Sequence, residues 1–129
     1  MAVELPGIRL SKVAAGTIEQ FHFVKLNSSG EVVQCTVDGE LPLGVSQDTA
    51  SAGDPVAVLV SGETKIRLGE NLMPGMTVGT TTAGRAGEKQ WSTTGGDAGD
   101  WNMGQCTVGG LSGEIGSMVY GVPTFRAAP

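Results

Sequence analysis

The chain has few residues that could carry out chemistry, and His22 with Cys35 comes nearest to a reactive pair. A cysteine beside a histidine can act as a thiol nucleophile, because the imidazole accepts the thiol proton. His22 is the only histidine of the 129 residues, and no recognisable motif supplies the third group that orients the base in a triad. Because Phe21 and Phe23 flank it, we expect His22 on the exposed face of a strand. The sequence therefore predicts a protein that is not an enzyme.

Two further segments contain ligand-binding residue types, but neither has the pattern of a site. The glycine-rich segment 79–84 (GTTTAG) is followed by Arg85-Ala86, where a phosphate loop requires Lys-Ser/Thr and a helix. It is therefore expected to form a hairpin. Asp97 and Asp100 lie in a glycine-rich loop, but two carboxylates are too few for a calcium site. The sequence predicts no cofactor and no metal.

Trp91 and Trp101 bracket the polar stretch 93–100 of an inserted loop at 88–100, and both are candidate interface residues. Tryptophan is enriched at interaction hot spots, and only 5% of the chain is aromatic. The alternative is that both rings cap the protein's own core beneath the loop.

The N-terminal arm, residues 1–12, is the second candidate contact region. It carries Leu5, Ile8 and Leu10 around a Pro-Gly pair. Such a segment could add as a strand to the sheet edge of a partner. It could equally be the first strand of this protein's own barrel, or a disordered end.

The composition restricts the possible functions. A chain of 129 residues is expected to form one domain. Its net charge is −5 and its eight basic residues form no stripe, so nucleic-acid binding is not expected. No apolar run is long enough to span a membrane. Residues 1–12 lack a basic region followed by an apolar one, so we expect no signal peptide and synthesis in a cytoplasm. Cys35 and Cys106 are then expected to be reduced thiols rather than a disulfide.

Short apolar runs separated by glycine-rich turns predict an all-β fold. The fold class expected is a small barrel or sandwich of short antiparallel strands. The strand that Pro55 begins is apolar on nearly both faces, so it is expected to be central.

The two halves of the sequence resemble one another. Residues 43–62 are echoed at 103–121, with Gly44 on Gly104 and Gly53 on Gly113, and Val24 aligns with Val78. At the start of the repeat, residues 13–16 align with 66–69. We therefore expect a single β domain at 13–122, with duplicated halves at about 13–62 and 66–122, and a C-terminal tail at 123–129. Exposed edges of such a barrel favour a symmetric oligomer.

Several Gly-turn-strand segments carry a resemblance to a known family. These are Gly44-Val45, 49–53, 54–60 and Gly62, followed by Gly69, 74–78 and 82–86. Together they resemble the bacteriophage capsid cement, or decoration, proteins, over roughly residues 13–87 with a weaker match through Tyr120. The loop at 88–100 and the N-terminal arm depart from the family pattern.

The resemblance implies a small β-barrel-like structural protein without a catalytic site. It would lie in the virion, on the outside of an expanded phage head, typically as a homotrimer that clamps neighbouring major capsid protein subunits. The capsid or subunit contacts are expected at Leu5, Ile8, Leu10, Trp91 and Trp101. The alternative is another virion surface module, such as a head-fibre base or a carbohydrate-binding β domain.

Overall fold

The computed structural model describes residue 2 and residues 5–89 and 100–126, with the backbone alone at 5, 6, 100 and 122–126. The described chain forms nine strands: β1 (Leu5–Val13), β2 (Phe23–Leu26), β3 (Val32–Gln34), β4 (Gly44–Ser46), β5 (Pro55–Arg67), β6 (Thr77–Thr80), β7 (Ala86–Glu88), β8 (Asp100–Val108) and β9 (Ile115–Arg126).

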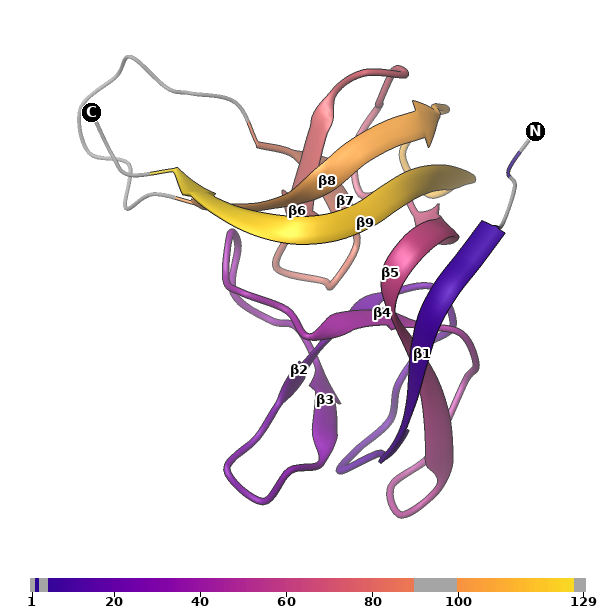
Figure 1. Cartoon of the computed structure of the whole chain (residues 1–129), viewed down its shortest axis with the longest axis vertical. Helices are drawn as coiled ribbons and strands as arrows, with labels where there is room; N and C mark the ends of the chain where they lie inside the picture. Colours follow the sequence, from indigo (N-terminus) through magenta and orange to yellow (C-terminus); the bar gives the residue numbers. More distant parts are fainter. Residues whose placement is uncertain (1, 3–4, 90–99, 127–129) are drawn as a thin grey trace.

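All nine strands belong to one antiparallel sheet that curls into a half-barrel. The order is β3-β2-β4-β5-β9-β8-β6-β7, and β1 pairs with β5 beside this path. Figure 1 shows β1 to β4 in the lower part of the molecule and β6 to β9 in the upper part, with β5 running between them. The predicted all-β class is confirmed, and β5 is central because it pairs with β1, β4 and β9.

The strand order is symmetric about the β5–β9 pair, and the register shows that the two halves repeat one another. Val24 pairs with Gln34 in β2–β3, and the residues 54 positions later, Val78 and Glu88 (78 − 24), pair in β6–β7. Val45 pairs with Leu59, and the residues 60 positions later (105 − 45), Gln105 and Val119, pair in β8–β9. Corresponding backbone N–H and C=O groups in the two halves therefore form corresponding ladder hydrogen bonds.

The repeat begins earlier than the sequence comparison placed it, because β5 serves both halves. Val13 in β1 pairs with Pro55, and Arg67 at the end of β5 pairs with Ile115 in the matching way. Residues 5–12 thus belong to the sheet as β1 rather than standing apart from it as an arm. The alignment of 13–16 with 66–69 is wrong by one residue, because Ala14 bridges β3 as Leu68 bridges β7. Because small apolar residues follow one another here, no single residue in the sequence marks the correct offset between the two halves.

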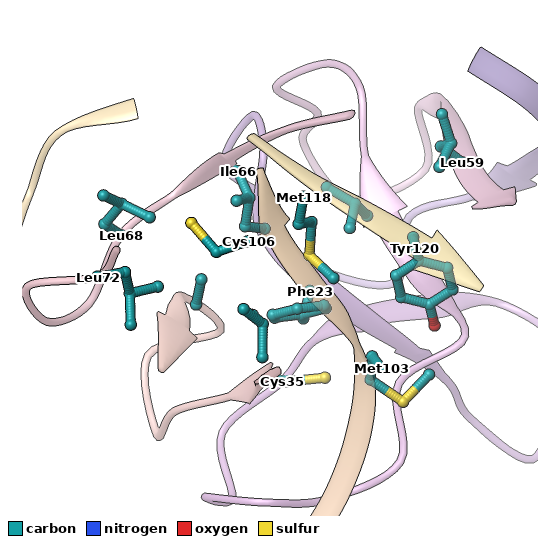
Figure 2. Packing of buried hydrophobic residues seen from close by; sticks show 13 residues of the cluster. Phe23, Cys35, Leu59, Ile66, Leu68, Leu72, Met103, Cys106, Met118 and Tyr120 are labelled. Carbon is teal, nitrogen blue, oxygen red and sulfur yellow. The ribbon is translucent and has the colours of Figure 1, made fainter. Parts of the chain in front are cut away.

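Two buried clusters fill the curled sheet. The smaller lies in the first half and consists of Ala14, Ile18, Val24, Val32, Ala50, Val56 and Val58. The larger joins both halves and includes Phe23, Cys35, Leu59, Ile66, Leu68, Met103, Met118 and Tyr120 (Figure 2). The Phe23 and Tyr120 rings meet across it, with centroids 6.3 Å apart. Burial of this shared cluster opposes separation of the halves, since apolar surface would return to water.

The repeated cores differ by exchanges that conserve volume. The first half has the small Ala14 where the second has Leu68, and it has Val56 where the second has Gly116. A side chain at Gly116 would lie 3.0 Å from Leu68 Cδ2. The larger leucine therefore fills space that the missing side chain leaves, as dense packing requires.

Gly44 lies where β2 and β5 both approach β4 closely. It pairs with Val24, and a Cβ atom there would collide with the carbonyl oxygen of Leu59 and lie 2.7 Å from Val58 Cγ1. Gly104 occupies the matching place in the second half, where a Cβ would collide with Val119 O. Both halves thus need a residue without a side chain at this crossing.

We predict that Gly44→Ala lowers the free energy of unfolding by about 2–3 kcal/mol, because backbone and a packed valine must move to admit the methyl group. Urea unfolding followed by tryptophan fluorescence measures this as a fall in the midpoint. Gly16→Ala is the matched control, because nothing lies within 4 Å of a Cβ at that position. Equal midpoints for the two variants would contradict the close approach at Gly44.

Candidate interaction surface

His22 is buried beside the bend before β2, and the prediction of an exposed ring is wrong. Only 2% of the residue is accessible. Phe21 adopts φ 60°, which breaks the alternation of a strand, so that His22 and Phe23 are both buried in succession. Nδ1 lies 2.9 Å from Gln20 O, and Nε2 lies 3.0 Å from a Glu19 carboxylate oxygen without hydrogen-bond geometry. Burial lowers the pKa of His22 below its usual value of 6.5, and the hydrogen bond to the Gln20 backbone and the Glu19 carboxylate oppose this only in part.

Cys35 and Cys106 are free thiols, as expected, and both are buried. Burial, reinforced by the Glu40 carboxylate, raises the pKa of Cys35 to about 12. The thiolate is the reactive form of cysteine, so Cys35 stays protonated at neutral pH. The ring of His22 contacts Gln20 and Glu19 instead, and no activated thiol results.

The segment 79–84 forms the hairpin that was predicted for it. Thr80 pairs with Ala86, and Thr81 N donates to Arg85 O at 2.9 Å. Gly84 adopts φ 73°, which glycine allows without strain. Asp97 falls outside the described residues, and within them no group of three or more His, Cys, Asp or Glu could hold a metal ion. In the same part of the chain, no helix is long and apolar enough to cross a bilayer.

Strand β1 presents apolar side chains at an edge of the sheet. One side of β1 pairs with β5, and no other described strand pairs with it. Ile8 is 58% exposed and Leu10 is 37% exposed. Leu5 belongs to the same strand, but its side chain is outside the described atoms. An edge that is both unpaired and apolar is a surface that proteins normally cover.

Trp101 does not join this edge. It lies on β8, which β9 and β5 separate from β1, and its half-buried side chain packs against the larger core cluster. Its backbone N–H donates to Gly39 O at 2.9 Å. The structure thus places Trp101 where it helps to cap the core, while Trp91 lies outside the described residues.

An apolar groove beside β2 was missed by the sequence reasoning. It has a volume of about 290 Å³ and is lined by Lys25, Leu26, Leu41, Pro42 and Leu43. Leu26 and Leu41 are each 46% exposed. Lys25 Nζ lies 2.7 Å from a Glu40 carboxylate oxygen at the rim. In the sequence, Leu26 and Leu41 resemble ordinary strand residues. The hydrophobic pattern therefore does not indicate that their side chains stay exposed.

A second hollow, of about 450 Å³, lies at the start of β6. Its lining residues are Met73, Pro74, Gly75, Met76, Thr77 and Glu88. Gly75 matches Phe21 of the first half, because Gly75 N donates to Cys106 O as Phe21 N donates to Ser46 O. The hollow thus lies where the second half lacks an aromatic ring.

Comparisons with known protein families and with curated proteins find no match. Among solved structures, the fold is similar to the N base of head fiber gp8.5 in bacteriophage phi29, with a TM-score of 0.68. The match covers 88% of this chain and 92% of that chain, at 14% sequence identity. At this identity the similarity shows a shared fold over almost the whole of both chains.

The buried His22 predicts a loss of stability in mild acid. Below the usual pKa of 6.5 the unfolded chain takes up a proton that the folded protein, with its lowered pKa, does not yet accept. The free energy of unfolding should therefore fall as the pH drops below 6.5, until the folded pKa is passed. Urea midpoints measured between pH 7.5 and pH 5 test this, with His22→Gln as the comparison. The same pH dependence in both proteins would contradict the assignment to His22.

Proposed function

We propose that this chain is a structural protein of a bacteriophage head, held on the outside of the expanded capsid as a decoration (cement) protein. The observation that supports the proposal most is the fold, which matches the N base of head fiber gp8.5 of phage phi29 over 88% of this chain. The Gly-turn-strand resemblance to cement proteins supports a place on the outside of the head. The solved structure and this resemblance both concern proteins of phage particles.

The exposed edge of β1 fits subunit contact in such an assembly. Ile8 and Leu10 lie on a strand whose outer side no described strand covers. Pairing this edge with another chain satisfies its backbone groups and buries the two side chains. We assign β1, including Leu5, to contact within a trimer or with the major capsid protein. Trp91 and Trp101 remain candidate contacts on the second half.

A protein of this kind would act by mass action. A ligand that binds only the assembled, expanded shell stabilises the shell by its binding free energy. An oligomer that makes several modest contacts at once binds more tightly than any single contact would allow. No catalytic step is needed for this function.

A head-fibre base is the second candidate, and the similarity to the N base of head fiber gp8.5 supports it as well as it supports the decoration role. A base anchors an appendage to the head, so it must bind the capsid but need not stabilise it. The two roles share the fold and the location, and they differ in the effect on the shell.

Heads of the encoding phage that lack this protein provide the test. We expect the purified chain to co-sediment with expanded heads but not with unexpanded ones, and to raise the temperature at which the heads break. Binding without a change in that temperature would support the fibre-base role instead. Absence of binding to expanded heads would rule out both.

We predict that the double variant Ile8→Asp/Leu10→Asp disrupts the free oligomer, since two charges would replace apolar side chains at a buried edge. Sedimentation velocity should give the mass of three chains for the wild type and of one chain for the variant. Leu111→Asp is the control, because Leu111 is equally apolar and 62% exposed but lies in the second half. A wild type that sediments as a single chain would contradict the trimer.

A further inference from the structure

The two halves contain the same junction between two loops. In the first half Ile18 bridges Ala50, and each residue donates its N–H to the carbonyl oxygen of the other, at 2.8 and 2.9 Å. In the second half Leu72, 54 positions later (72 − 18), bridges Gly110, 60 positions later (110 − 50), with both hydrogen bonds at 3.0 Å. The side chains at corresponding places of these loops can therefore be compared directly.

The side chains beside this junction are polar in the first half and apolar in the second. The first half has Glu19 and Ser51 there, and both are exposed. The second half has Met73, which is 63% exposed, and Leu111, which is 62% exposed. Each of them follows a residue of the bridge, whose Leu72 points into the core, so both point outward. Since the first half folds with polar residues at these places, the fold does not require the apolar pair.

The hollow of about 450 Å³ borders Met73 and Met76, and the first half has an aromatic ring at the matching place. Phe21 stands there in the place of Gly75, and Lys65 Nζ lies 5.9 Å from the centroid of its ring. A Cβ atom at Gly75 would meet nothing within 4 Å. The first half thus shows which groups suit this place, namely an aromatic ring with a cation over its face.

Two carboxylates stand at the rim of the hollow where the first half has neutral residues. Glu70 takes the place of Gly16, 54 positions earlier (70 − 16). Glu88 takes the place of Gln34 in the strand register and borders the hollow. Glu70 accepts the N–H of Glu88, and within the described part of the chain neither carboxylate forms an ion pair. An apolar centre with a charged rim is typical of a protein interface, and this rim attracts a cation.

We propose that the surface formed by Met73, Met76 and Leu111, the methionine surface, receives an aromatic side chain from a neighbouring major capsid protein subunit. The ring enters the hollow at Gly75, where methionine thioethers contact it favourably. A lysine or arginine of the same segment pairs with the carboxylates at the rim. This inference rests on the proposed function. It assigns the capsid contact to the second half, which leaves the β1 edge for contact between copies of this chain.

Exchange of residues between the halves tests the methionine surface on expanded heads that lack the protein. Met73→Glu and Leu111→Ser introduce the residues that the first half has at the same places. We expect each to weaken binding about tenfold or more, as loss of a central apolar contact does. Because both side chains are exposed, urea midpoints of the free variants should stay close to that of the wild type. Ser51→Leu is the matched control and should bind as the wild type does.

A ring placed on Gly75 tests the hollow directly. Gly75→Phe fills the place that the partner's ring would take, so we expect binding about tenfold weaker or more. Gly75→Ala is the matched control, because it introduces the same strain at φ 92° without the ring. Equal binding by these two variants would overturn the insertion of a ring.

The salt dependence of binding tests the cation of the partner. Wild-type binding to the heads should weaken as sodium chloride rises, because the salt screens the attraction of the rim carboxylates. The double variant Glu70→Gln/Glu88→Gln should bind more weakly at low salt and respond less to added salt. The same salt dependence in both proteins would overturn the basic partner.

The remaining outcomes separate this site from the proposed function. Wild-type binding that Met73→Glu, Leu111→Ser and Gly75→Phe all retain would overturn the site and leave the proposed function standing. Absence of wild-type binding would overturn both. A lower mass of the free particle for Leu111→Ser would assign the surface to a second copy. A urea midpoint of free Gly75→Phe far below that of Gly75→Ala would show that the chain fills its own hollow, and either result would overturn the proposal.

Discussion

The architecture depends on one strand that pairs along its whole length with successive partners. The first part of β5 pairs with β1 and β4, and its last part pairs with β9. Because β5 ends the first repeat and begins the second, the two halves cannot shift relative to one another without breaking ladder hydrogen bonds. A shift by one residue would also turn Val58 and Ile66 away from the core. The larger buried cluster lies across this junction and adds apolar burial to the same constraint.

Within that constraint, the two halves have diverged differently inside and outside. Inside, changes compensate one another, as Leu68 fills the space beside Gly116. At the surface no such compensation is needed, and Leu41 and Trp101, 60 positions apart, have different surroundings. Leu41 borders an open groove, whereas the backbone N–H of Trp101 donates to Gly39 O. Divergence at the surface therefore gives each half its own contact chemistry on a common scaffold.

Much of the fold followed from local sequence signals. Alternating valines after Pro55 marked the central strand, and the glycine-centred turn at Gly84 marked the β6–β7 hairpin, because in both cases a residue's own chemistry sets the local geometry. The burial of His22 did not follow, since it depends on the positive φ of Phe21, which is rare outside glycine. The open groove beside β2 could not be predicted from the sequence either. Whether Leu41 is covered depends on contacts with residues distant in the sequence, and an exposed leucine has the same local pattern as a buried one.

The locations of the unsatisfied surfaces bear on how an assembly would form. The outer edge of β1 and the groove beside β2 both belong to the first half, but they offer different interactions: a row of backbone groups with exposed Ile8, and a concave apolar site at Leu26. An edge pairs readily with an identical edge, whereas a groove requires a protruding partner. Oligomerisation through the edge would present several copies of the groove at once.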